Sequence, residues 1–128
     1  SDHEGARAAY AEVESAWRTS IPEDAPIRVV LYASIARNEL ALGDLAAATR
    51  NADRSLGLAR KHDGESTAVA DALALTAEIA QARGDRARAT VTWNDAAEML
   101  ARVSPGDAAR AAAWRGAARG AADGQAAE

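Results

Sequence analysis

Two short stretches decide the fold: "ALGDLAAAT" (41–49) and "ARGDRARAT" (82–90). Each holds a Gly-Asp pair, an alanine five residues after the glycine and a threonine directly after that alanine, and the two glycines, Gly43 and Gly84, lie 41 positions apart. A turn that returns with its surroundings indicates a structural repeat. The tripeptide at 83–85 also matches the adhesion signal of some extracellular proteins. Because Leu-Gly-Asp stands in the same place one repeat earlier, we interpret it as a hairpin turn, with Gly84 in the left-handed conformation and Asp85 capping the next helix.

The other breakers alternate between short turns and longer loops. The loops are "IPEDAP" (21–26) and "KHDGES" (61–66), "SPGD" (104–107) is typical of a helix start, and "DGQ" (123–125) predicts a third tight turn around Gly124. Between them apolar residues recur at helical spacing, as at Ala89, Trp93, Ala96 and Leu100. The pattern predicts six helices, at about 4–19, 26–42, 45–61, 66–83, 86–102 and 106–122.

Composition favours closely packed helices. Hydrophobic residues make up 48% of the 128 positions, but most are alanine, with no Phe and a single Met. Alanine is the best helix former and lets backbones approach one another. We therefore expect an all-α fold, a right-handed stack of antiparallel helical hairpins (an α-solenoid). One repeat domain spans 1–128, with the second helix of a preceding repeat at 1–20, repeats at 26–62 and 66–103, and a partial repeat at 106–128.

Charge and length exclude several classes of function. With 15 basic and 19 acidic residues, the net charge is −4, so we expect no direct binding of nucleic acid by this segment. There are no cysteines, which fits a cytoplasmic location and leaves no thiolate for catalysis or metal binding. The longest apolar run, "VVLYA" (29–33), is far shorter than the roughly 20 residues of a membrane span, so we expect no membrane insertion.

At these positions the chain resembles the tetratricopeptide family. In the first full repeat the matching residues are Tyr32, Ile35, Ala36, Gly43, Ala48 and Leu56, in the second Leu73, Thr76, Ala77, Gly84, Ala89, Trp93 and Ala96, and in the partial third Trp114, Ala117, Ala118 and Ala121. The period is nearer 40 than the family's usual 34 residues. Together with "AARAAAWRGAARGAADGQAAE" (108–128), it resembles the repeat domains of actinobacterial helix-turn-helix transcription regulators. The resemblance implies a protein-interaction module within a larger regulatory protein.

The resemblance also implies a binding surface, because the first helix of each hairpin lines a concave groove in that family. By the matched positions, the groove-facing residues are Arg37, Leu40, Glu78, Gln81, Arg115 and Arg119, bordered by Val30, Asp71 and Ala74. The family's clamp for terminal carboxylates uses Lys and Asn, and this chain offers only Arg37 there. We expect a protein or peptide partner in the groove. The alternative is a ligand-sensing repeat domain that binds a small peptide or metabolite in it.

Catalytic chemistry has no visible carrier in the sequence. The two histidines, His3 and His62, have no second ligand at metal-binding spacing, so we expect no metal, no cofactor and no enzyme activity. Two arginine groups, 83/86/88 and 110/115/119, are interpreted as solvated helix faces in preference to phosphate sites. A weak homodimer through a terminal helix is also expected, either at Trp17 or at the stripe formed by Trp114, Ala117, Ala118 and Ala121.

Overall fold

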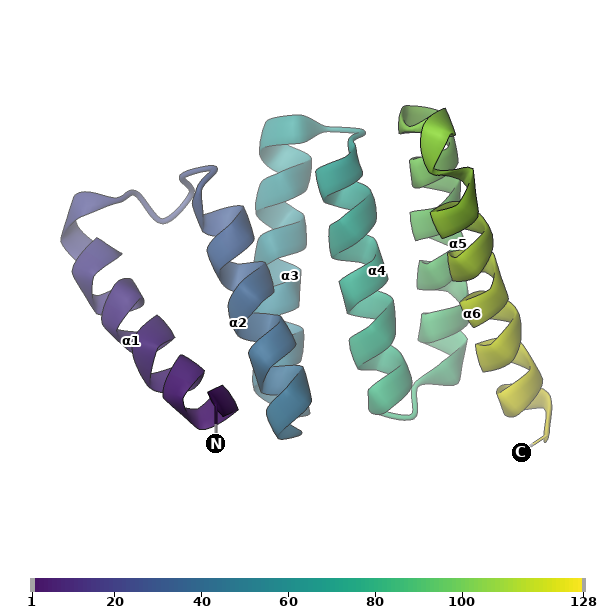
Figure 1. Cartoon of the computed structure of the whole chain (residues 1–128), viewed down its shortest axis with the longest axis horizontal. Helices are drawn as coiled ribbons and strands as arrows, with labels where there is room; N and C mark the ends of the chain where they lie inside the picture. The colour runs from purple at the N-terminus through teal and green to yellow at the C-terminus, as the bar shows by residue number, and fades with distance from the viewer. Residues whose placement is uncertain (1, 128) are drawn as a thin grey trace.

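Six α-helices account for nearly all of the chain that the structure describes (Figure 1). The computed structural model describes residues 2–127, with side chains from 2 to 124, and holds no strand in that range. The helices are α1 (Asp2–Ser20), α2 (Arg28–Leu42), α3 (Leu45–Asp63), α4 (Thr67–Ala82), α5 (Arg86–Val103) and α6 (Ala108–Ala127), with a short 3-10 helix, η1 (Pro105–Asp107), before α6. The expected all-α class is confirmed. Every predicted helix end except the last lies within two residues of the observed one.

The two Gly-Asp turns have the same conformation. Gly43 and Gly84 are both left-handed, with φ of 80° and 81°. In each turn the N–H of the following aspartate donates to the carbonyl five residues earlier, at 2.9 Å. The carboxylates of Asp44 and Asp85 then accept from the backbone N–H three residues on, at 3.3 Å and 3.2 Å, and so cap α3 and α5. The repeat inferred from the sequence is therefore a repeat of local geometry as well.

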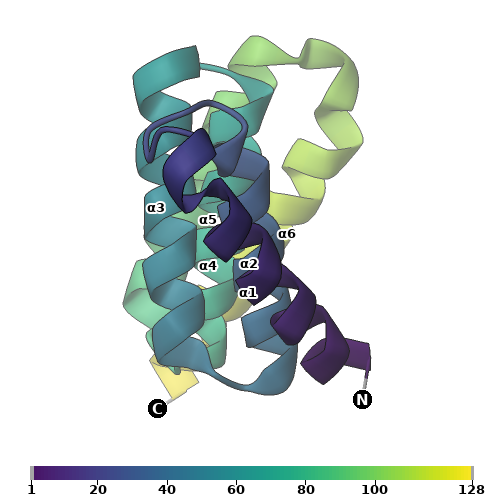
Figure 2. The same ribbon diagram turned by 90° about the vertical axis from the view of Figure 1, so that its left-hand side faces the viewer.

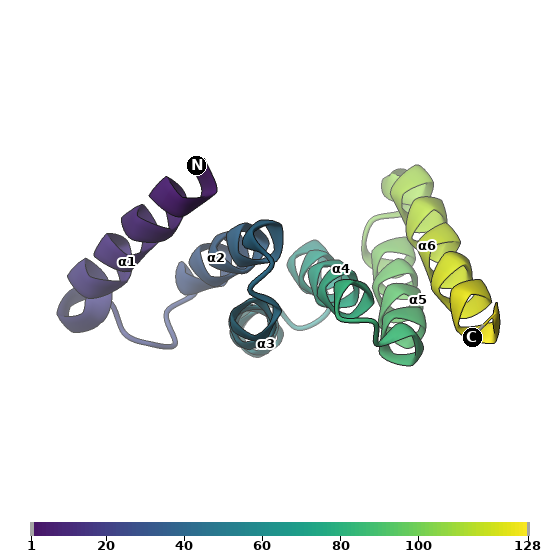
Figure 3. The same ribbon diagram turned by 90° about the horizontal axis from the view of Figure 1, so that it is seen from below.

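The helices stand in a row of antiparallel hairpins. α2 and α3 form one hairpin and α4 and α5 the next, while α3 and α4 connect the two. Seen from below (Figure 3), α3 and α5 lie on one side of the row, and α2 and α6 lie on the other. α6 packs on α5 and α1 on α2, so each helix contacts mainly its neighbours in the chain.

Alanine forms the closest contacts inside each hairpin. Ala36 and Ala48 belong to one buried cluster, and Ala77 and Ala89 belong to another. All four have no exposed surface. Since a methyl group keeps two helices close, these four positions fix the spacing within both hairpins. Ala48 thus packs with Ala36 in the first hairpin, and Ala89 packs with Ala77 in the second.

The end of the chain differs from the expected turn. α6 continues through residues 123–125, and Gly124 does not adopt a left-handed φ. A Cβ at Gly124 would overlap the guanidinium of Arg86, at the start of α5. This glycine therefore makes room for a neighbouring side chain and does not turn the chain, so the predicted tight turn at 123–125 is wrong.

The apolar stripe of α6 faces inward. Ala118 and Ala121 are buried in the cluster that also holds Trp93, and Trp114 packs against Trp93 with ring centroids 6.4 Å apart and ring planes tilted by 42°. We expected this stripe to lie on an outer face, and the structure corrects that. The apolar face of α5, which includes Trp93 and Ala96, is buried against this stripe of α6.

One buried arginine anchors the C-terminal end of the first helix. α1 has no buried residue, and Figure 2 shows it inclined to α2 and α3. Arg28, at the start of α2, is only 4% exposed. Its Nη2 donates to the carbonyls of Trp17 (3.1 Å) and Ile21 (2.7 Å), and its Nε donates to that of Pro22 (2.7 Å). The Trp17 and Pro22 carbonyls also accept from the backbone N–H groups of Ile21 and Ala25, so Arg28 adds a second bond to each and ties the end of α1 and the following loop to α2.

Candidate partner-binding groove

An apolar cavity of about 200 Å³ opens between α2 and α4. Its floor includes Ser55 of α3, whose hydroxyl donates to the carbonyl of Val29 at 2.8 Å and is thereby satisfied. The residues that line the cavity are Val29, Val30, Ala33, Arg37, Ser55, Ala68, Asp71, Ala72 and Leu75. Most of these side chains are apolar and small, so the cavity exists because alanine leaves room between two first helices of adjacent hairpins.

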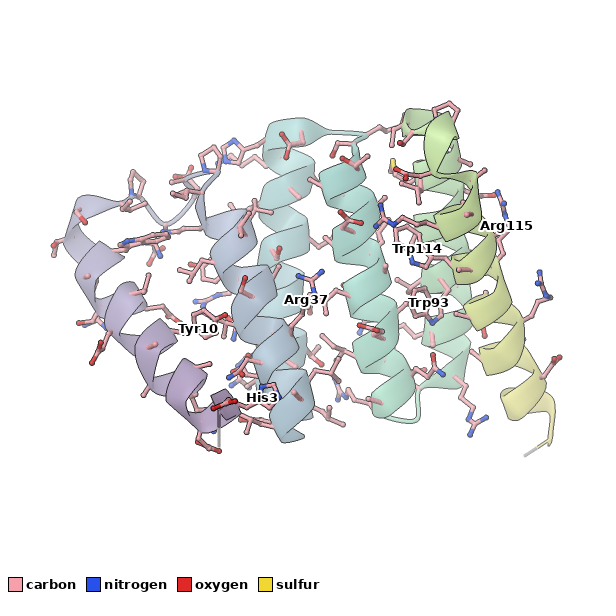
Figure 4. The ribbon with its side chains drawn as sticks, viewed as in Figure 1. His3, Tyr10, Arg37, Trp93, Trp114 and Arg115 are labelled. Carbon is pink, nitrogen blue, oxygen red and sulfur yellow. The ribbon has the colours of Figure 1, made fainter. Side chains whose placement is uncertain are left out.

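Two residues expected at the groove mark the rim of this cavity on α2. Val30 is 70% exposed, which is unusual for a valine beside an apolar cavity. Arg37 lies between α2 and α4 in Figure 4, it is exposed, and it forms no ion pair within residues 2–124. The α2 side of the cavity therefore presents an exposed apolar side chain and an uncompensated positive charge.

The α4 side carries a charge that is already matched. Asp71 accepts from Arg110 of α6 in an ion pair. Arg110 in turn lies over the ring of Trp114, with its guanidinium 5.0 Å from the ring centroid. Because both partners are about half exposed, the pair itself adds little stability. Its effect at the groove is to neutralise Asp71 and to leave Arg37 as the dominant charge.

The other expected groove residues of α2 and α4 lie apart from this cavity. Leu40 is half-buried against the cluster that contains Ala36. Glu78 is exposed on α4. Gln81 accepts a hydrogen bond from the indole Nε1 of Trp93 at 3.2 Å, so it is tied to α5. The cavity therefore brings Arg37 together with Val30 and Asp71. Leu40, Glu78 and Gln81 do not line it.

Arg115 and Arg119 do not join the cavity either. Arg115 lies five positions after Arg110, so the two side chains point about 140° apart around the axis of α6. Since Arg110 reaches Asp71 on α4, Arg115 lies on the opposite side of α6, and Figure 4 shows it pointing away from the row. Arg119 is exposed one turn further along. Matched repeat positions predicted these two arginines in the groove. The packing of α6 on α5 rotates α6 so that they lie elsewhere.

The arginines around the second turn are engaged within the fold. Arg83 donates to the hydroxyl of Thr49 at 3.0 Å, and Arg88 pairs with Asp53 at 3.6 Å. Asp85 caps α5. Arg83 and Asp85 thus bind neighbouring elements of the same chain, as the hairpin interpretation requires.

Both histidines serve the fold, and each bonds a different element. His3 Nδ1 donates to the side-chain oxygen of Asn38 at 2.9 Å, and Asn38 Nδ2 donates back to the His3 carbonyl at 2.8 Å. His62 Nε2 donates to the carbonyl of Asp24 at 2.6 Å. Lys61 also pairs with the Asp24 carboxylate at 2.8 Å, and this bond and charge hold the pKa of Asp24 below its usual value. Across the described residues no group of three acidic, His or Cys side chains gathers as a metal site.

Sequence reasoning missed the two buried polar residues of α2, Arg28 and Asn38. Both bind α1: Arg28 at its C-terminal end and Asn38 through His3 near its N-terminal end. Nothing in the local sequence distinguishes a buried arginine from an exposed one. The useful signal would have been the weak apolar stripe of α1, which cannot hold that helix without polar anchors.

Comparison with known proteins identifies the fold and no more. No family model matches the sequence, and no curated protein matches it. Among solved structures the chain is similar to the crystal structure of BtubC (BKLC) from P. vanneervenii, with 19% identity, a TM-score of 0.86, and coverage of 95% of this chain and 50% of that one. The chain therefore spans half the length of BtubC. No helix among residues 2–127 is long and apolar enough to cross a membrane.

Proposed function

We propose that this chain is a protein-interaction module that binds a segment of a partner protein in the groove between α2 and α4. The observation that carries the proposal is the apolar cavity flanked by the exposed Val30 and by Arg37, which has no ion-pair partner among residues 2–124. An apolar side chain of the partner would fill the cavity, and a carboxylate beside it would meet Arg37. Buried anchors of this kind supply most of the binding energy in protein interfaces.

The apolar lining of the cavity, together with its small size, favours one side chain of a peptide over a polar metabolite. Sites for small molecules usually measure about 300–1,000 Å³ and enclose most of the ligand. The groove cavity, at about 200 Å³, has room for one side chain of a longer segment. A ligand-sensing domain is the alternative, and it would bind a small molecule here without any flanking chain.

The resemblance to the tetratricopeptide family supports this proposal, since recurrent Gly-Asp turns and buried alanines occur at the matched positions. We propose in addition that the chain belongs to a larger, cytoplasmic regulatory protein resembling transcription regulators. No catalytic role is assigned to it.

Selection from a random peptide library displayed on phage tests the function. We expect enriched peptides to share one large apolar residue next to Asp or Glu. Replacing Ala68, which lines the cavity, by Trp should fill it and weaken binding of the selected peptides at least about tenfold. Ala46→Trp, at an exposed position of α3, is the matched control and should leave binding unchanged.

Two outcomes would contradict the proposal. If the selected peptides bind Ala68→Trp as tightly as the parent, the cavity is not their site. If no peptide is enriched, while single amino acids or other small molecules bind the parent but not Ala68→Trp, the ligand-sensing alternative replaces the peptide-binding proposal. Circular dichroism of both variants checks that the helices are intact.

A further inference from the structure

A second cavity of about 200 Å³ lies between α1, α2 and α3 and shares no lining residue with the groove. α1 packs mainly on α2, and within the described residues no comparable contact joins it to α3. Its lining is polar and charged, unlike that of the groove. The residues that line it are Glu14, Arg18, Glu23, Arg28, Tyr32 and Arg54.

The floor of this cavity offers a positive charge and a hydroxyl donor. Arg28 and Tyr32 are 4% and 6% exposed. Within the described residues Arg28 bonds only to backbone carbonyls and, at 3.4 Å, to the Tyr32 hydroxyl, so no carboxylate offsets its charge. The hydroxyl accepts that bond and keeps its own proton without an acceptor there. A buried charge without a counterion is costly, so the site gains from an anionic group beside it.

The rim carries charges of both signs that do not pair with one another. Glu14 and Arg18 of α1, Glu23 of the following loop and Arg54 of α3 all line the cavity, and none of the four forms an ion pair in the part of the chain that the structure describes. Arg54 instead lies over the Tyr32 ring, 5.0 Å from its centroid. Glu14 and Arg18 have i,i+4 spacing on α1 but do not pair there, so both charges are available to a ligand.

We propose that this cavity binds an α-amino acid as its zwitterion. The carboxylate would lie against Arg28 and the Tyr32 hydroxyl, with Arg18 and Arg54 at its edge. The ammonium group would lie against Glu14 and Glu23. A purely anionic ligand would be repelled by those two glutamates, and a cation would be repelled by the three arginines. A volume of about 200 Å³ lies below the roughly 300–1,000 Å³ of sites for drug-sized ligands, so only one of the smallest amino acids would fit, and the charged lining would orient it.

Three probes separate the two charges in solution: L-alanine, sodium acetate and methylammonium chloride. Each is titrated into the whole chain at constant ionic strength, and the amide shifts of residues 14–32 and of Arg54 are followed by NMR. We expect saturable shifts with L-alanine, and much weaker ones with acetate or methylammonium. Arg18→Gln and Glu14→Gln should each weaken alanine binding about tenfold.

Matched controls carry the same substitutions outside the cavity. Arg60→Gln on α3 and Glu12→Gln on α1 are exposed and should change the affinity for alanine less than about twofold. An equal loss of affinity for alanine in the controls and in the cavity variants would overturn the assignment. Such a loss would come from the overall electrostatic potential of the protein and not from this cavity. Acetate binding as tightly as alanine would overturn the zwitterion, and so would the absence of saturable shifts with alanine up to ~10 mM. Ala68→Trp should leave alanine binding intact, which keeps this test independent of the groove.

Discussion

At the scale of single residues, glycine has opposite effects at different positions. Gly84 follows α4 with a φ of 81°. A residue that has a Cβ adopts this left-handed conformation only with strain. Gly57 lies inside α3 without a left-handed φ, and no atom approaches within 4 Å of a Cβ built there. The first glycine is required by the turn, whereas the second only weakens a helix.

Alanine substitution should separate these two roles. We expect Gly84→Ala to lower the free energy of unfolding by about 1–2 kcal/mol, because it places a Cβ in the left-handed region. Gly57→Ala should raise it by about 0.5–1 kcal/mol through helix propensity. Urea denaturation of both variants measures the effects. Changes of the same sign would show that backbone conformation does not decide these sites.

Overpacking tests the alanine contacts inside the hairpins. Ala48→Leu and Ala89→Leu should each destabilise the protein by roughly 1–3 kcal/mol, since both positions have no exposed surface to take up the added atoms. Ala46→Leu, at an exposed position of α3, should change stability by less than about 0.5 kcal/mol. Unchanged melting temperatures for both buried variants would contradict the assigned repeat register.

The ion pair of Asp24 and Lys61 gives a pH dependence of known sign. The hydrogen bond and charge of Lys61 lower the pKa of Asp24, so the pair stabilises the fold above the ordinary carboxyl pKa and is lost as the pH falls through the lowered value. Lys61→Gln should raise the pKa of Asp24 toward its ordinary value, and Lys61→Arg should keep it low. An NMR titration of the Asp24 carboxyl carbon measures this. A low pKa in Lys61→Gln would place the cause elsewhere in the loop.

At the scale of helices, local signals predicted the elements but not their rotation. The turns at Gly43 and Gly84 and the cap at Asp85 could be inferred because neighbouring residues determine them. The sequence around Gly124 resembled that of a third turn. This glycine instead leaves space for the side chain of Arg86, 38 positions earlier, and the local sequence does not contain that contact.

The same distinction explains what was predictable in the candidate groove. Arg37 follows Ala36, whose matched position packs against Ala48 of α3, so the side of α2 that carries Arg37 was inferred from matched positions. Arg115 is on α6, whose rotation follows from burying Ala118 and Ala121 against α5. Packing between distant elements determines such a side, and residue spacing alone does not contain it.

Hydrogen exchange should rank the helices by their burial. We expect amides of α1 to exchange fastest, because that helix has no buried residue, and those of α4 and α5 slowest. α6 should lie between them, since Gly116 and Gly120 each cost about 1 kcal/mol relative to alanine. Mass spectrometry of peptic fragments measures the order. Protection of α6 equal to that of α4 would contradict it, and so would α1 outlasting either.

At the scale of the whole molecule, the row has two ends with different exposed faces. A weak homodimer through a terminal helix stays a prediction, but the Trp114 stripe packs inside and cannot form it. A dimer through α6 would have to use its outer face, where Ala109, Ala112 and Gly120 are exposed. The exposed arginines Arg115 and Arg119 lie beside these small residues, so the apolar contact would be limited in area.

Sedimentation velocity across a concentration range tests this association. We expect a dissociation constant on the order of 0.1–1 mM, with Ala112→Glu weakening association and Arg37→Glu leaving it unchanged. Loss of association in Arg37→Glu alone would place the contact in the groove. A monomer at every concentration would remove the homodimer altogether.

The neighbour-to-neighbour packing of the helices also governs how quickly the chain reaches its structure. Each helix contacts mainly those adjacent to it in sequence, so only short loops must close before burial begins. Chains dominated by such local contacts fold in microseconds to milliseconds. The α4–α5 hairpin carries the largest share of the buried side chains, and folding would start there and extend outward one helix at a time. α1, joined last through Arg28, would dock on a surface that is already complete.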